Sequence, residues 1–279
     1  MIITTFVFAI QDGISLYLAG RYNTVTIVTI RYWFFAVFVI LLLKKPWKGS
    51  NNSISSRHLL LQIIRGLLLV SEVCVMVYAF TKLGLVQSHA IFIIYPLLIA
   101  FLAGPLLKET VTLSRWIAIV MGFCGVFIIL QPEVLVFNLL YLVPFCSALM
   151  FAIYAILTRY VTANDSSEVS FFWTGIIGAI AITFWGPFFW DPPVGGDWLW
   201  MGALCLSGAF GHYLLIKTLE TAEASAIQPF SYFQLVFASI FGVIIFNEAI
   251  TIKVFVGTSI IILAGLITFY VEKNVQHQD

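Results

Sequence analysis

Long apolar runs separated by short polar hinges make up most of this chain. Two such runs fill the stretch 85–130, and they are joined by the hinge Lys108-Glu109-Thr110-Val111-Thr112. The runs are about 20 and 17 residues long, which is enough to cross a hydrocarbon core of roughly 30 Å at about 1.5 Å per helical residue. Runs of this length predict membrane-spanning helices.

The same hydropathy pattern predicts ten membrane spans along the chain. They cover residues 2–19, 24–43, 58–80, 86–107, 114–130, 138–158, 169–190, 195–217, 222–246 and 252–271. The connections are short, and the longest is residues 44–57. No soluble domain fits between the spans, and no phosphate-binding loop of the GxxxxGK[ST] type is present to support an ATP-driven pump.

The polar hinge occurs twice. Its second copy is Asn247-Glu248-Ala249-Ile250-Thr251, and a shift of 139 positions places Glu109 on Glu248 and Thr112 on Thr251. A structural role is expected for both hinges, because each threonine can cap the N-terminus of the following helix. The repetition predicts two similar units of five spans each.

The positive charges predict how the units lie in the membrane. If the N-terminus is cytoplasmic, nine Lys and Arg fall on the inner side and three on the outer side, with two more inside spans. This bias places both termini in the cytoplasm. Because five is odd, the second unit enters the membrane from the opposite side. The expected fold is therefore an all-α integral protein of the cytoplasmic (inner) membrane, with ten transmembrane helices in two inverted five-helix repeats, residues 1–131 and 132–279.

Composition excludes several classes of function. Apolar residues make up 61% of the chain and charged residues only 10%, whereas soluble domains carry about 25% charged residues. The net charge of +1 gives no signal for nucleic-acid binding. The four histidines are scattered without an HExxH pattern, and the four cysteines form no CxxC pair. No enzyme activity, metal or cofactor is expected. The N-terminal segment is interpreted as a retained membrane span rather than a cleaved signal peptide, because it lacks a basic region and carries Asp12.

The chain resembles a known transporter family in two places. The segment AIFIIYPLLIAFLAGPLLKETVTLSRW, followed by GFCGVFIILQP, is similar to the fourth and fifth helices of an EamA-type repeat. The segment ASAIQPFSYFQLVFASIFGVIIFNEAIT is similar to the same part of a second repeat, although Leu235 stands where a proline is common. Two such units resemble the ten-helix branch of the drug/metabolite transporter superfamily. The resemblance implies secondary transport of small metabolites, with a central cavity formed by helices 1, 3, 4, 6, 8 and 9.

Ionisable residues inside spans are the first candidates for a site, because a charge at the bilayer centre costs about 2.5–3.5 kcal/mol. Asp12 and Glu72 both fall near mid-membrane, where they would form a cation or proton site, or hydrogen-bond to a neighbouring helix. Arg65 lies two turns from Glu72 on the same helix face. The two would hold the ends of a zwitterion, or Arg65 would extend to the inner interface. Arg31 is expected to lie off the cavity with a structural partner.

A histidine and several aromatic residues complete the candidate site. His212, like Glu72, is a candidate proton carrier. The alternative for His212 is a role in helix packing. Aromatic rings next to a carboxylate would surround an organic ammonium through cation–π attraction, although each tyrosine would serve helix packing equally well. Gln234 adds a polar group to the predicted cavity wall. The aromatic candidates are Tyr78, Tyr95, Tyr154, Trp173, Tyr213 and Tyr232.

The sequence thus predicts a carrier of a small amine-bearing or zwitterionic metabolite, either amino-acid-like or an organic cation. Alternating access, with proton coupling or exchange, is the expected mechanism. The alternative is a broad exporter of hydrophobic or anionic metabolites and drugs. The expected partners are a small-molecule substrate and the lipid bilayer, with no nucleic acid, in a monomer or homodimer.

Overall fold

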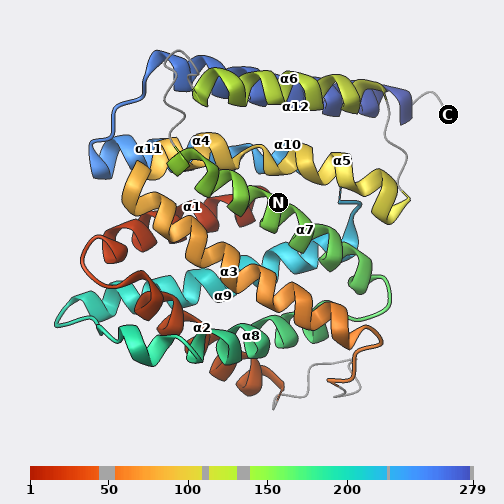
Figure 1. Cartoon of the computed structure of the whole chain (residues 1–279). Helices are drawn as coiled ribbons and strands as arrows, with labels where there is room; N and C mark the ends of the chain where they lie inside the picture. The colour runs from red at the N-terminus through yellow and green to blue at the C-terminus, as the bar shows by residue number, and fades with distance from the viewer. Residues whose placement is uncertain (44–53, 109–112, 131–138, 225–226, 277–279) are drawn as a thin grey trace.

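The computed structural model describes residues 1–43, 54–108, 113–130, 139–224 and 227–276 (Figure 1). These residues form helices and no strand. The helices are α1 (Ile2–Ala19), α2 (Thr24–Leu43), α3 (Leu59–Leu83), α4 (Leu85–Phe92), α5 (Tyr95–Leu107), α6 (Leu113–Leu130), α7 (Leu142–Thr162), α8 (Ser167–Thr183), α9 (Asp197–Thr221), α10 (Gln228–Ser231), α11 (Phe233–Phe246) and α12 (Ile252–Gln276), with short 3-10 turns η1 (Leu139–Tyr141) and η2 (Gly186–Phe189).

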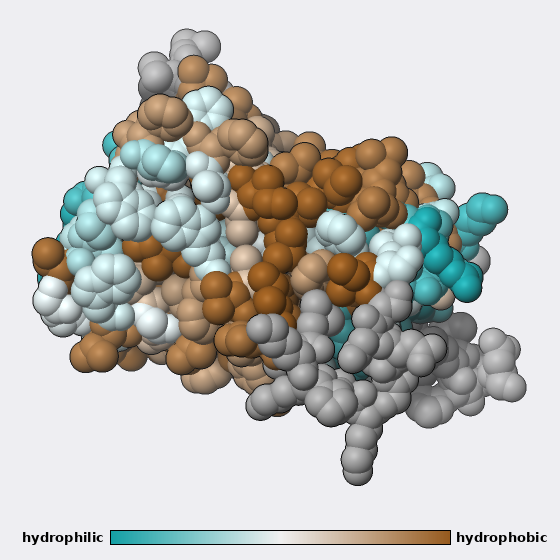
Figure 2. Space-filling model, turned by 90° about the horizontal axis from the view of Figure 1, so that it is seen from below, coloured by the Kyte–Doolittle hydropathy of each residue, from teal (hydrophilic) through white to brown (hydrophobic). Residues whose placement is uncertain are grey.

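Six helical stretches of the described chain are long and apolar enough to cross a membrane: residues 2–19, 24–41, 59–83, 85–107, 139–162 and 197–221. Large apolar side chains face outward, as Phe188 and Leu199 do with 80% and 81% of their surface exposed, while charged side chains such as Arg65 and Glu72 are buried. Figure 2 shows brown apolar surface across the middle of one face and teal polar surface toward one end. This inside-out distribution suits a bilayer, where polar groups must find partners within the protein.

The helices lie in layers (Figure 1). α6 and α12 pack side by side as an outer layer, next to the layer of α4, α5, α10 and α11. α1, α3, α7 and α9 occupy the centre, and α2 packs against α8 on the far side. In the centre, α1 packs against α9 and α11, and α7 packs against α3 and α5.

Glycines bring α8 close to its neighbours. A Cβ atom at Gly178 of α8 would lie 2.1 Å from a ring carbon of Tyr32 in α2, and one at Gly66 of α3 would lie 2.8 Å from Ile177 in α8. Neither position accepts a larger side chain without displacing its neighbour. The close contact of α8 with α2 and α3 therefore depends on these two glycines.

The fourth predicted span, 86–107, is not one continuous helix. α4 ends at Phe92, and α5 begins at Tyr95 with Pro96 in its first turn. Pro96 has no N–H to donate to the carbonyl four residues earlier, so the helix is interrupted just before it. The ninth predicted span, 222–246, is likewise divided, because α10 ends at Ser231 and α11 begins at Phe233.

The second hinge has the structural role expected of it. Asn247 ends α11 with a left-handed backbone (φ 53°), and Lys108 ends α5 in the same way (φ 59°). The Oγ1 atom of Thr251 accepts a hydrogen bond of 3.3 Å from the N–H of Val254, which caps α12. The carboxylate of Glu248 accepts from two N–H groups of α4. Glu109 and Thr112 of the first hinge lie outside the described residues.

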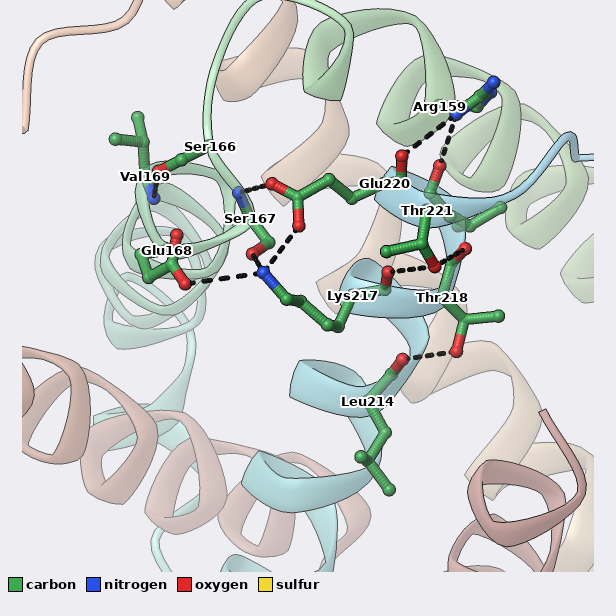
Figure 3. A network of polar contacts seen from close by, with 11 residues as sticks. Arg159, Ser166, Ser167, Glu168, Val169, Leu214, Lys217, Thr218, Glu220 and Thr221 are labelled. Carbon is green, nitrogen blue, oxygen red and sulfur yellow. Dashed lines mark hydrogen bonds and ion pairs between the residues drawn. The ribbon is translucent and has the colours of Figure 1, made fainter. Parts of the chain in front are cut away.

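Polar contacts join the helix ends on both sides of the bundle. On one side, Lys217 of α9 lies 2.7 Å from Glu220 and 3.7 Å from Glu168 of α8 (Figure 3). There, Arg159 of α7 donates to two carbonyl groups at the end of α9. On the other side, Arg21 lies 3.2 Å from Asp197, and its hydrogen bond to Asp197 raises the pKa of the guanidinium.

Candidate functional site

A polar cavity of about 40 Å³ lies among the central helices. Its polar wall residues come from six helices, α1, α2, α3, α4, α9 and α11, and are Gln11, Asp12, Arg31, Glu72, His89, His212 and Gln234. The rest of the wall is apolar: four aromatic rings, Phe8, Phe80, Phe92 and Phe151, and the side chains of Val73, Met76 and Val77. The volume corresponds to about three water molecules at roughly 10–15 Å³ each.

Asp12 is held where α1, α4 and α11 meet. Its Oδ2 atom accepts a hydrogen bond of 3.1 Å from Nε2 of Gln234, and Gln11 donates to Oδ1 over 3.4 Å. Nε2 of His89 lies 3.1 Å from Oδ2, which is ion-pair distance, but the ring direction leaves both nitrogens of His89 without a hydrogen bond. Asp12 therefore has polar neighbours on three sides and still faces the cavity.

Glu72 is the second carboxylate of the cavity. It is 5% exposed, and its Oε1 atom accepts a hydrogen bond of 2.7 Å from Oγ of Ser147 in α7. Among the described residues, no cation lies within ion-pair distance of it. A buried carboxylate with one neutral partner is a strong acceptor for a cationic group.

Arg31 of α2 also faces the cavity, which corrects the expectation that it lies elsewhere. Its Nη2 atom donates to Oε1 of Gln11 over 3.0 Å and contacts Nε2 of His212 over 3.1 Å. Gly208 makes room for it, because a Cβ atom there would lie 2.8 Å from Nε of Arg31. The cavity thus holds one guanidinium as well as two carboxylates.

Comparison with known proteins identifies the family. Residues 1–131 and 138–270 match the EamA-like transporter family. The chain belongs to this family. It is therefore a transporter rather than an enzyme.

Its relatives in the EamA-like family include transporters of two named metabolites. The S-adenosylmethionine uptake transporter of Rickettsia prowazekii is 28% identical over 268 residues, which cover 95% of this chain and 90% of that protein. The riboflavin transporter of Brucella anthropi is 26% identical over 254 residues, which cover 89% of each chain. A protein of known crystal structure has the same fold, with a TM-score of 0.67 at 14% identity over 98% of both chains.

The helices that contribute to the cavity differ in one respect from those implied by the resemblance. Helices 1, 3, 4, 6, 8 and 9 were implied, and α1, α3, α4, α7, α9 and α11 do contribute to its wall. α2 contributes as well, through Arg31. Sequence reasoning placed Arg31 off the cavity because span 2 is not among the cavity helices that the resemblance implies. Gln11 and Ser147 carry no charge, so hydropathy alone gives no signal for them.

Arg65 lies outside the cavity, in a network of its own. Although it shares α3 with Glu72, it is fully buried and donates to Gln62, to Thr158 of α7, and to Ser170 and Thr174 of α8. These bonds occupy the guanidinium, so it neither extends to the interface nor faces Glu72. Arg65 thus joins α3, α7 and α8 and does not line the cavity.

The aromatic candidates are dispersed rather than gathered around the cavity. Tyr95 is buried just behind the wall and donates to Oε1 of Gln234 over 3.4 Å. Tyr154 packs beneath the Arg65 guanidinium, 5.4 Å from ring centre to Cζ. Tyr78 is 44% exposed, and the indole N–H of Trp173 donates to a backbone carbonyl, that of Ile54. Tyr213 and Tyr232 are not part of the wall.

The described residues contain no group of three or more His, Cys, Asp or Glu side chains that could hold a metal ion. The cavity wall offers carboxylates, a guanidinium and aromatic rings. Such a set binds and orients a charged organic molecule.

Proposed function

We propose that this chain is a secondary carrier of a small amine-bearing or zwitterionic metabolite across the inner membrane. The observation that supports it most is that Asp12 and Glu72 are both buried and both line one cavity. Two buried carboxylates are costly in a membrane unless they bind cations. The rings of Phe8, Phe80 and Phe92 add faces that attract an organic cation.

Alternating access between two inverted five-helix repeats, residues 1–131 and 132–279, is the proposed mechanism. Tyr95 and Gln234, which are 139 positions apart, contact each other, as equivalent residues do only beside a two-fold axis. The left-handed residues Lys108 and Asn247 are also 139 positions apart. These relations support two repeats with ten membrane crossings arranged around the cavity. The Lys and Arg bias of the connections supports both termini in the cytoplasm.

A metabolite requires a wider cavity than the present one. The space of about 40 Å³ holds a few water molecules, whereas ligand pockets commonly measure about 300–1,000 Å³. Rocking of one repeat against the other would open the cavity to one side of the membrane at a time. Protonation of Glu72, with His212 nearby, or exchange of solutes would drive the cycle.

S-adenosylmethionine is the first compound to test, because relatives of this chain carry it. The experiment measures uptake of radiolabelled S-adenosylmethionine, basic amino acids and simple amines into proteoliposomes containing the purified protein. Glu72→Gln is the diagnostic variant. Glu168→Gln is its control, because Glu168 lies at the start of α8 outside the cavity.

We expect Glu72→Gln to lower transport at least tenfold and Glu168→Gln to leave it within about twofold, since a buried charge-assisted contact contributes about 1.5–3 kcal/mol. Unchanged transport of every substrate by Glu72→Gln would overturn the assignment of the site. Absence of transport across the whole panel would overturn the proposed substrate class.

Transport of a hydrophobic or anionic compound is the second candidate. Four phenylalanine rings line the cavity, and the riboflavin transporters among the relatives carry an aromatic compound. Under this alternative, riboflavin or lipophilic drugs would be transported, and Arg31 would matter more than Glu72. Competition assays with these compounds distinguish the two candidates.

A further inference from the structure

Arg31 is a buried cation without a direct ion pair among the described residues. It is 4% exposed, it lines the cavity, and among the described residues no carboxylate lies within ion-pair distance of it. Burial of an ionised group is costly unless an opposite charge accompanies it. Asp12 and Glu72 line the same cavity, but neither forms an ion pair with Arg31. Their contacts are with Gln11, Gln234, His89 and Ser147.

The present partners of Arg31 are neutral. Nη2 donates to Oε1 of Gln11 over 3.0 Å and lies 3.1 Å from Nε2 of His212. A guanidinium only donates, so Nε2 of His212 accepts, and the ring is neutral with its hydrogen on Nδ1. Both hydrogen bonds of Arg31 leave from one nitrogen. Among the described residues, Nε and Nη1 donate no hydrogen bond, so these two nitrogens keep donors for a carboxylate.

The position of the guanidinium depends on Gly208. A Cβ atom at Gly208 would lie 2.8 Å from Nε and 3.3 Å from both Cζ and Nη2 of Arg31. The guanidinium therefore lies across α9 in a space that any side chain would occupy. The absence of a side chain at Gly208 allows a cation from α2 to reach a cavity otherwise formed by other helices.

We propose that Arg31 binds the carboxylate of the transported molecule, while Asp12 and Glu72 face its positive groups. This inference rests on the proposed function and narrows its substrate class. Apart from its two histidines, the wall carries two carboxylates and one guanidinium. A matching solute has two cationic centres and one carboxylate, as S-adenosylmethionine and the basic α-amino acids do.

The test compares each acid with its decarboxylated amine. Three pairs are used: S-adenosylmethionine with its decarboxylated form, arginine with agmatine, and lysine with cadaverine. Binding to the purified protein is measured by ligand-dependent thermal stabilisation, and transport by competition in proteoliposomes. The readout is the ratio of acid to amine affinity, which a merely structural role of Arg31 would not change.

The wild-type protein is expected to prefer the acid of at least one pair by about tenfold to hundredfold, the range of a charge-assisted contact. Arg31→Gln should reduce this ratio to within about threefold of unity and leave amine binding in place. Gly208→Ala, which retains the charge but displaces the guanidinium, should lower the same ratio. Gly202→Ala on the same helix is the control, because nothing lies within 4 Å of its added Cβ atom.

Three results would contradict these expectations. Equal wild-type affinity for acid and amine would overturn the role of Arg31 and leave the proposed function intact. An equal loss of acid and amine binding in Arg31→Gln would assign Arg31 to the fold instead. If Arg31→Gln does not fold, the ratio measured for Gly208→Ala decides. If no compound binds to the wild-type protein or is transported by it, the proposed function fails, and this inference fails with it.

Discussion

The hydroxyl of Tyr95 donates a hydrogen bond to Oε1 of Gln234, a residue 139 positions further along the chain. The same shift of 139 relates Lys108 to Asn247, the two left-handed helix ends. Gln234 in turn donates to Asp12 over 3.1 Å. The contact between equivalent positions therefore orients one carboxylate of the cavity.

Tyr95→Phe is expected to loosen Gln234 and, through it, Asp12. The loss of one buried hydrogen bond should lower stability by about 0.5–1.5 kcal/mol. Thermal unfolding in nanodiscs measures the change, with Tyr270→Phe as the control, because Tyr270 is 68% exposed. Equal unfolding temperatures for the two variants would show that the Tyr95 hydroxyl contributes nothing.

Gly178→Ala should destabilise the protein by about 1–3 kcal/mol or more, because the new methyl group would meet the Tyr32 ring at 2.1 Å. Gly202→Ala is the matched variant, with open space around its Cβ atom. It should gain about 0.5–1 kcal/mol from helix propensity. Unfolding midpoints that change in the same direction would contradict the packing of α8 on α2.

Arg65→Lys should lower stability by about 2 kcal/mol or more and leave substrate preference unchanged. Lysine keeps the charge, but it cannot reach Thr158, Ser170 and Thr174 together, as the planar guanidinium does. Unfolding and acid-to-amine selectivity are measured on the same preparation. A change in selectivity would return Arg65 to the binding site.

Glu248→Gln should weaken the start of α4. The Glu248 carboxylate accepts hydrogen bonds of 2.7 Å from the N–H groups of Leu85 and Val86, at the positive end of the helix dipole. Loss of the charge should cost about 1–2 kcal/mol. Glu223→Gln, at an exposed position, should change stability by less than about 0.5 kcal/mol. Similar losses in both variants would contradict the capping role.

Asp165→Asn should change how steeply the unfolding temperature falls at acidic pH. Burial raises the pKa of Asp165, but hydrogen bonds from Ser56, the Arg57 N–H and Gln62 outweigh this effect and hold the pKa below its usual value. A carboxyl group with a lowered folded pKa stabilises the protein above its unfolded pKa of about 3.9 and loses this contribution as the pH falls through the folded value. Unfolding temperatures between pH 3 and 7 should therefore decline more steeply in the wild-type protein than in the variant. Parallel curves would refute the contribution.

Several residues could be interpreted from their sequence context because the signals are local. The hinge pattern around Glu248 and Thr251 predicted a structural role, and Thr251 does cap α12. The charges of Asp12 and Glu72 within apolar runs indicated a buried polar site, since hydrocarbon tolerates such charges only with partners. Length and hydropathy alone predicted where most long helices lie.

Other features required the tertiary structure. Arg65 and Glu72 share a helix face by sequence spacing, yet Arg65 is held by α7 and α8, while Arg31 reaches the cavity past Gly208. Hydropathy and periodicity report which residues enter the membrane and on which face of their own helix they lie. They do not report which helices become neighbours. The sequence by itself thus determined the apolar helices, the repeated hinge and the transporter class. Helix packing decided which charges share one cavity, because the contacts that place them join different helices, such as Asp12 with Gln234 and Arg31 with His212.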